Sequence, residues 1–262
     1  MTEAMGMGAY AAQEIGSMSF QVPNGNVDIL VKDDAAAIVA VKQYLSYFQG
    51  PVDHFEAPDQ RRMRHIIPEN RVRTYDMREI INTLADEDSV LEIRREFGIG
   101  VLTAFIRVEG RPLGVVANNP APLAGAIDTP GADKGARFLQ LCDAFDIPTV
   151  VLMDCPGIMV GPDHERQALV RHSVRLFNIG ANFTAPMFGV MVRKAYGLGV
   201  QAMIGGEGAA GIDEDDRKPG QVRHRRQELG DVHGADDDEP PGRGVNAQKI
   251  LAPAVLENGA LA

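Results

Sequence analysis

Short apolar runs alternate with segments of helical periodicity between residues 89 and 206, and this alternation constrains the fold more than any other feature of the chain. The β-branched runs at 148–153 and 186–192 have the length and composition of buried strands. The helical segments lie at 132–145 and 164–179, and a third begins near Leu198. Strands separated by helices in this order predict an α/β domain with crossover connections.

The beginning of this region predicts antiparallel strands instead. A short strand is expected at 89–93. It is followed by two runs, 100–108 and 112–118, on either side of Glu109-Gly110-Arg111, which predicts a β-hairpin.

Two predicted helices carry an apolar stripe, which is typical of a helix that packs on a core. The first helix follows Asp33 or Asp34, either of which suits the N-cap position. Its stripe comprises Ile38, Val41, Leu45 and Phe48. The stripe of the helix at 164–179 comprises Val170, Val174 and Phe177.

Composition divides the chain into three parts. Residues 1–88 hold the first helix, a linker-like stretch of mixed charge at 50–73, and a short helix at about 76–84. Residues 89–206 form the compact α/β part. Residues 207–262 contain no Phe, Tyr, Trp or Met and show neither helical nor strand periodicity, so we expect them to be largely disordered.

Bulk properties exclude several classes of function. The net charge of −10 argues against general nucleic-acid binding, which needs a basic face. There is no signal peptide and no apolar run of about 18 residues, so we expect no membrane span and a cytoplasmic location. Cys142 and Cys155 lie in apolar runs, which is typical of buried, reduced thiols.

The segment from Met191 to Gly199 is the strongest candidate for a functional site. A predicted strand ends here, a glycine turn follows and a helix begins. Backbone N–H groups at a helix start are unpaired and carry the positive end of the helix dipole. Glycines let a substrate oxygen approach such donors, so Gly197-Leu198-Gly199 could form an oxyanion hole from backbone alone. The same spacing also fits an ordinary strand-to-helix turn.

A second glycine turn, from Asp154 to Gly161, follows the predicted strand at 148–153. Ligands of α/β folds bind at the carboxyl ends of strands, so this turn could line a pocket. A simple loop is the alternative interpretation. Cys155 lies within the turn, but the sequence shows no partnering base that would make it a nucleophile.

His164, Glu165 and His172 resemble a metal site at first sight. The zincin pattern needs its second histidine at position 168, which is alanine. Histidines that are hydrogen-bonded or face solvent are the simpler interpretation, and we expect no metal site.

Taken together, these segments resemble the carboxyltransferase (beta) subunits of biotin-dependent acetyl-CoA and propionyl-CoA carboxylases. The similar segments are YDMREIINTLAD (75–86), GRPLGVVANNPAPLAGAIDTPGADKGARFLQLCDAF (110–145), FDIPTVVLMDCPGIMVGPDHE (145–165), VRH (170–172) and APMFGVMVRKAYGLG (185–199). Their shared order and density are far more specific than any single motif.

The resemblance implies a crotonase-like α/β fold of stacked ββα units. It also implies an enzyme that transfers a carboxyl group from carboxybiotin, carried on a separate protein, to acetyl-CoA or propionyl-CoA through enolates held by backbone oxyanion holes. The implied partners are a biotin carboxylase or biotin carrier subunit and other carboxyltransferase chains. No metal, nucleic acid or membrane is implied.

The family's biotin-side oxyanion turn usually reads Ala-Tyr-Gly-Gly-Ala-Tyr. This chain matches it at 195–197, and then Leu198 replaces the second glycine and Gly199 the alanine. The resemblance makes the backbone N–H groups of Leu198 and Gly199 the donors, and backbone donors survive a change of side chain.

Further residues on the biotin side are implied by matching positions. Ile158 replaces the aromatic residue of the family's Pro-Gly-Phe turn. Gln201 replaces an aspartate linked to acyl choice, so the acyl preference stays open. The implied set is Pro156, Gly157, Ile158, His172, Tyr196 and Gln201.

The resemblance covers only part of a family member. Residues 1–88 look like the remnant of an N-terminal carboxyltransferase domain plus a linker, without the acyl-CoA oxyanion hole, and 89–206 look like a shortened C-terminal domain. The resemblance stops after Gly206, which suggests a frame-shifted or misassembled end. Three interpretations stay open: the biotin-side component of a carboxyltransferase, a non-catalytic remnant that associates with intact subunits, and another crotonase-type enzyme such as a hydratase or decarboxylase subunit.

Overall fold

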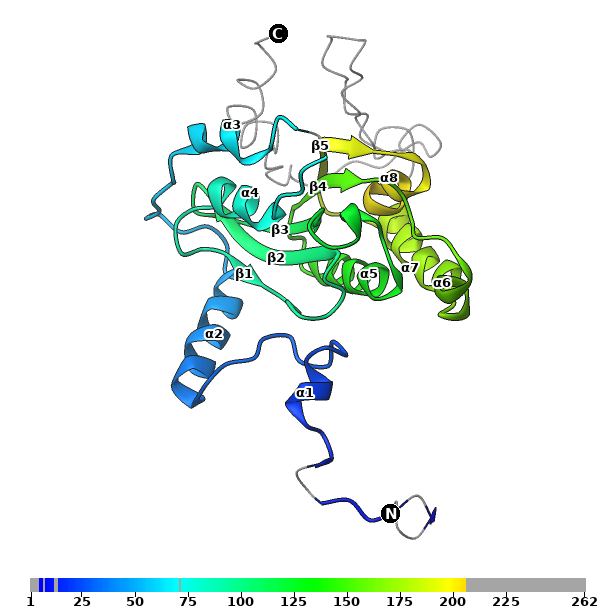
Figure 1. Cartoon of the computed structure of the whole chain (residues 1–262). Helices are drawn as coiled ribbons and strands as arrows, with labels where there is room; N and C mark the ends of the chain where they lie inside the picture. Colours follow the sequence, from blue (N-terminus) through cyan, green and yellow to red (C-terminus); the bar gives the residue numbers. More distant parts are fainter. Residues whose placement is uncertain (1–4, 7, 12–13, 71, 206–262) are drawn as a thin grey trace, which may run out of the picture.

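The computed structural model describes residues 5–6, 8–11, 14–70 and 72–205, so the disorder and altered end predicted for 207–262 lie outside it. Within these residues a five-stranded sheet has the order β1-β2-β3-β4-β5 (Figure 1). The strands are β1 (Leu91–Glu92), β2 (Val101–Val108), β3 (Arg111–Asn118), β4 (Thr149–Cys155) and β5 (Met187–Ala195). The first three are antiparallel, and β3, β4 and β5 are parallel to one another. The predicted α/β sheet is confirmed.

The helices follow the predicted alternation. They are α1 (Met18–Gln21), α2 (Asp34–Ser46), α3 (Met63–Ile66), α4 (Met77–Leu84), α5 (Thr129–Ala144), α6 (Pro162–Arg166), α7 (Leu169–Asn182) and α8 (Gly197–Ile204), with 3₁₀ turns η3 (Gln60–Arg62) and η4 (Leu123–Gly125). None of the helices in the described part is long and apolar enough to cross a membrane.

Helices cover both faces of the sheet, and the alternation of side chains along β4 shows how. Val151 and Met153 lie in a core cluster with residues of α5, α7 and α8. Val150 and Leu152 lie in a second cluster with residues of α4. Successive side chains of a strand point to opposite faces, so an unbroken apolar strand is what a sheet covered on both faces requires.

The tight turn between β2 and β3 forms the predicted hairpin. Glu109 has a φ of 51° and Gly110 a φ of 74°, and two left-handed residues match the twist of paired strands. The Asp86 carboxylate accepts hydrogen bonds from the N–H groups of Glu109 (3.0 Å) and Gly110 (2.7 Å). Arg111 belongs to β3 rather than to the turn.

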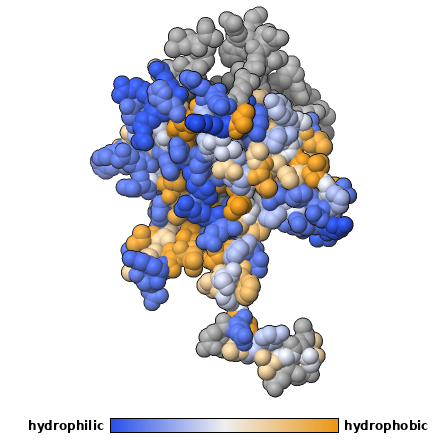
Figure 2. Space-filling view, viewed as in Figure 1, coloured by the Kyte–Doolittle hydropathy of each residue, from blue (hydrophilic) through white to orange (hydrophobic). Residues whose placement is uncertain are grey.

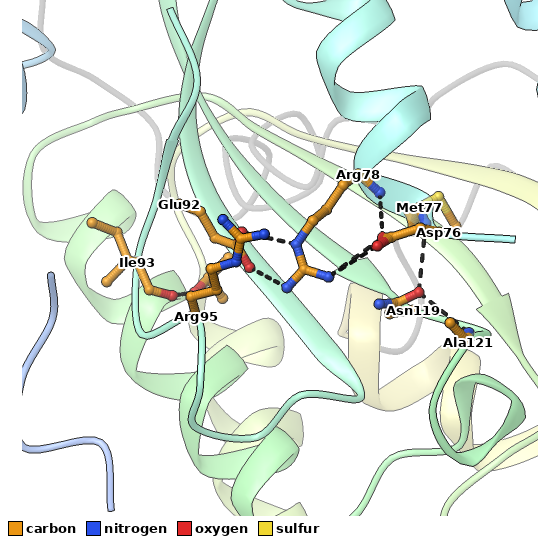
Figure 3. Close-up of polar contacts among 9 residues, drawn as sticks. Asp76, Met77, Arg78, Glu92, Ile93, Arg95, Asn119 and Ala121 are labelled. Atoms are coloured by element: carbon orange, nitrogen blue, oxygen red, sulfur yellow. Dashed lines mark hydrogen bonds and ion pairs between the residues drawn. The ribbon is translucent and has the colours of Figure 1, made fainter. Parts of the chain in front are cut away.

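Figure 3 shows how polar contacts tie α4 to the sheet and to the loop after β3. Arg78 donates to the Glu92 carboxylate from Nη2 (2.6 Å) and Nε (2.9 Å), which joins α4 to β1. Asn119 Oδ1 accepts from the N–H groups of Met77 (3.5 Å) and Ala121 (3.3 Å). The start of α4 therefore also fixes the loop that leads towards η4.

The helix predicted at 164–179 is wrong as a single element. Ala168 between α6 and α7 has a φ of 57°, in the left-handed region that a helix of L-residues does not continue through. The predicted stripe is wrong for Val170 (75% exposed) and Val174 (44% exposed), because α7 buries Leu169 and Leu176 instead. Its third member, Phe177, does pack against the core.

The strand predicted to be buried at 186–192 is only half-buried. β5 is an edge strand of the described sheet, so one side lacks a neighbour, and Met191 is 44% exposed. β5 also runs on to Ala195, and its pairing with β4 is irregular. Met153 pairs with Met191, but Cys155, two residues later, pairs with Ala195, four residues later.

α2 extends away from the sheet (Figure 1). Its predicted start is confirmed, because the side chain of Asp33 accepts a hydrogen bond from the Ala36 N–H at 2.8 Å. Its predicted stripe is mostly uncovered: Phe48 packs on Phe105, whereas Ile38 is 57% and Leu45 51% exposed. Figure 2 shows the resulting apolar patch over α2.

Candidate functional site

The two glycine turns found in the sequence lie side by side at the carboxyl ends of β4 and β5. The Tyr196 N–H donates to the Cys155 carbonyl at 3.1 Å. A Cβ added to Gly199 would lie 2.8 Å from both Cys155 Sγ and Gly157 Cα. Only glycine at 199 therefore allows the first turn of α8 to approach the turn after β4 this closely.

The first of these turns presents the open amino end of α8. Tyr196 is its N-cap, and no described side chain caps the helix there. Gly197 has a φ of 55°, and a Cβ at this position would meet no atom within 4 Å. Leu198 is 63% exposed, so its side chain does not fill the space against the core. The unpaired N–H groups and the helix dipole make this end attractive to negative charge.

The second turn is fixed by strand-like pairing with the segment before α5. Ile158 pairs with Ile127 in an isolated parallel bridge. The Ile127 N–H donates to the Gly157 carbonyl (3.1 Å), and the Met159 N–H donates to the Ile127 carbonyl (2.9 Å). Gly157 has a φ of 136° with open space where a Cβ would be, and Pro156 is exposed. The turn is thus rigid yet open on its outer side.

Cys155 lies between the two turns, and its environment makes it inert. The thiol is fully buried, and burial raises its pKa, so it stays protonated. It is within 3.3 Å of both the N–H and the carbonyl of Gly157. Its role is to pack the turn rather than to attack a substrate.

Sequence reasoning missed a third segment of the site, the loop that contains η4. Gly125 has a φ of 84°, and a Cβ there would lie 2.0 Å from the Asp154 carbonyl oxygen. Lys194 Nζ donates to the Ala124 carbonyl at 2.8 Å. The one hint in the sequence was the glycine of PAPLAG (120–125). Its contact with β4 becomes visible only in the folded structure.

Two other residues implied by the resemblance lie in α7 and α8. His172 packs on α5, where its Nδ1 is 2.6 Å from Asp133 Oδ2, and Arg175 donates to Asp133 Oδ1 at 2.9 Å. Gln201 is exposed in the second turn of α8. Pro156, Gly157, Ile158 and Tyr196 do gather around Gly197-Leu198-Gly199.

Comparison with known proteins decides the family, because residues 1–212 match the carboxyl transferase domain. The chain belongs to the carboxyl transferase domain family. It is 39% identical over 194 residues to the uncharacterized carboxylase YngE of Bacillus subtilis, a match that covers 70% of this chain and 37% of that protein. It is 36% identical over 199 residues to the propionyl-CoA carboxylase beta chain of Roseobacter denitrificans, covering 71% and 39%. The chain therefore spans about two fifths of these relatives.

Solved structures confirm the crotonase-like fold of this carboxyl transferase domain. A single-chain, multi-domain long-chain acyl-CoA carboxylase is 48% identical with a TM-score of 0.76, over 79% of this chain and 21% of that one. The transcarboxylase 12S subunit, a hexamer with hydrolysed methylmalonyl-CoA bound, is 31% identical with a TM-score of 0.70, over 77% and 42%.

The carboxyl transferase domain offers backbone donors at its candidate site, at the amino end of α8. Across the described residues, no group of three or more His, Cys, Asp or Glu side chains could hold a metal ion. The amino end of α8, beside the open side of Gly157, suits a group that carries a negative or partly negative oxygen.

Proposed function

We propose that the chain supplies the biotin side of an acyl-CoA carboxyltransferase, which moves a carboxyl group from carboxybiotin on a carrier protein to acetyl-CoA or propionyl-CoA. The observation that carries this proposal is the close approach of Gly199 to Cys155 and Gly157, which leaves the amino end of α8 open beside a rigid turn. Membership of the carboxyl transferase domain family supports the same reaction.

The residues of the chain would act through backbone geometry. The N–H groups of Leu198 and Gly199 would donate to the oxygen on which negative charge develops, and the dipole of α8 would strengthen both bonds. Such donors stabilise a transition state without reorganising, because the helix already holds them. Gly157 would leave room for the ring of the bound group. When bound, carboxylated biotin would supply the carboxyl group itself.

The proposal includes partners. A biotin carboxylase or carrier subunit would deliver the carboxyl group, and a further carboxyltransferase segment would bind the acyl-CoA. A relative is named a beta chain, and transcarboxylase 12S forms a hexamer. Both facts support the proposal that this chain acts within an oligomer.

The test is to mix the purified chain with a carboxybiotinylated carrier and acetyl-CoA or propionyl-CoA, with and without intact carboxyltransferase subunits. Carboxylated acyl-CoA that depends on this chain is the expected result. Absence of product in every combination would favour a non-catalytic chain that only associates with such subunits. Hydration of an enoyl-CoA by the chain would instead favour another crotonase-type enzyme.

A further inference from the structure

A buried carboxylate lies at the start of the second glycine turn. Asp154, in β4, has no exposed surface. Its Oδ2 accepts hydrogen bonds from the Tyr75 hydroxyl (2.9 Å) and from Arg193 Nε (3.1 Å). Its Oδ1 lies 3.8 Å from Lys194 Nζ, beyond hydrogen-bond distance. A buried carboxylate is costly unless charged partners surround it, and here Arg193 and Lys194 supply the opposite charge.

The two cations come from the irregular part of β5. Between the pairs Met153–Met191 and Cys155–Ala195, β5 has two more residues than β4, and the residues involved include Arg193 and Lys194. Extra residues of this kind bend a strand and re-aim its side chains. Here both side chains turn towards Asp154, three to four residues before Gly197.

Each cation also reaches a separate segment. Arg193 Nη1 donates to the Arg73 carbonyl at 2.8 Å, and its guanidinium lies 5.1 Å from the centre of the Tyr75 ring. Lys194 Nζ donates to the carbonyl of Ala124 in η4. The cluster therefore joins the segment before α4, the η4 loop, β4 and β5 at one point.

We propose that Asp154 is a positioning residue for carboxyl transfer. It holds the irregular end of β5 against β4 and so sets the gap between the Gly157 turn and the amino end of α8. The role of Asp154 in catalysis rests on the proposed function. Its effect on the spacing of the two turns can be measured without any activity. If the carboxylate loses its charge, Arg193 and Lys194 lose their common anchor and the two turns separate more often.

Cys155 reports on that separation. Its buried thiol lies between the turns, whereas the equally buried Cys142 lies in α5. A thiol reagent such as DTNB reaches either cysteine only when the structure opens locally. We expect Asp154→Asn to raise the labelling rate of Cys155 at least about tenfold, as expected for loss of a buried charged hydrogen bond, and that of Cys142 by less than about twofold.

Two further variants keep the inference falsifiable. Tyr75→Phe removes one hydrogen bond to Asp154 and keeps its charge, so it should raise Cys155 labelling by a smaller factor, about threefold. Asp86→Asn removes another buried carboxylate, which follows α4 and accepts hydrogen bonds from the β2–β3 turn, and should leave Cys155 labelling unchanged. Equal acceleration of both cysteines, no acceleration of Cys155, or the same effect from Asp86→Asn would each overturn the inference.

Activity gives an independent readout. In the reconstituted transfer assay, Asp154→Asn should lower kcat about tenfold and leave KM for the carrier within about twofold, because the donors are displaced while the carrier surface is kept. A variant that raises KM alone would contradict a positioning role. If the wild-type chain transfers no carboxyl group, the proposed function fails while the cysteine result still decides the geometric claim.

Discussion

Replacing Gly199 with alanine tests the contact that defines the site. The new methyl group would sit 2.8 Å from Cys155 Sγ and Gly157 Cα, and 3.2 Å from the Gly157 carbonyl carbon. Carbon atoms prefer separations of about 3.5–4.0 Å, so the first turn of α8 must retreat by roughly 0.7–1.2 Å. Gly157 contributes backbone atoms, which cannot swing aside as a side chain can.

Two opposing effects set the change in the free energy of unfolding. Overpacking in a close contact costs about 1–3 kcal/mol, and alanine in a helix regains about 0.5–1 kcal/mol relative to glycine. Gly199→Ala should therefore destabilise the chain by roughly 1–2 kcal/mol. A displacement near 1 Å of donors in a reacting geometry costs on the order of 100-fold in rate, so kcat should fall far more than stability does.

The assays are urea unfolding for the free energy and the reconstituted transfer assay for kcat. The matched control is Gly135→Ala in α5, where the new Cβ would meet its nearest neighbour at an ordinary 3.4 Å. This control should be neutral or stabilising, with normal kcat. Equal behaviour of the two variants would refute the close contact at Gly199.

Four other substitutions test particular parts of the structure. Burial lowers the pKa of Lys134 from 10.5 to about 8, so the unfolded chain binds more protons between these two pH values and stability should rise with pH across that window. Lys134→Met should add roughly 2–3 kcal/mol to the free energy of unfolding at pH 7 and abolish the rise. Urea unfolding at pH 7 and 9.5 measures both effects. Ile38→Asp on the exposed face of α2 should change stability by less than about 0.5 kcal/mol, whereas Leu176→Ala in the core should cost about 2–5 kcal/mol by the same measurement. Asp133→Asn removes the charge that His172 and Arg175 share and should cost about 1 kcal/mol in the free energy of unfolding, by the same measurement.

The strands and the starts of α2 and α4 could be predicted because local signals specify them. Asp33, Asp76 and Asp128 each cap a helix by accepting a backbone hydrogen bond, and such caps need only a short stretch of sequence. The predicted start of the helix at 132 was nevertheless late. Proline at 130 tolerates the first turn of a helix, so α5 begins at Thr129.

The errors arose where tertiary position decides. Periodicity assigned Val170 and Val174 to the inner face of one helix, but the left-handed Ala168 separates α6 from α7 and resets the face that is buried. Periodicity likewise found the apolar stripe of α2 without showing that Ile38 would be exposed. An apolar stripe marks a surface suited to burial, and only the fold shows whether anything covers it.

The sequence located separate segments of the candidate site, and the structure showed which of them are neighbours. Each glycine turn was visible in the sequence, yet only the parallel pairing of β4 with β5 brings Gly157 and Gly199 together. The contributions of Gly125, Lys194 and Asp154 were missed, because they depend on contacts between residues far apart in the chain. His172 matches the family pattern in sequence, and the structure adds its contact with Asp133.

The central claim is that the backbone of Leu198 and Gly199, beside Gly157, receives biotin. The most direct measurement is a ¹⁵N-amide NMR titration of the chain with the biotinylated carrier domain, with the same domain lacking biotin as control. We expect shifts at these three amides that require biotin, and none at Gly110 in the β2–β3 turn. Identical shifts with the unbiotinylated carrier, or biotin-dependent shifts confined to other parts of the chain, would contradict the claim.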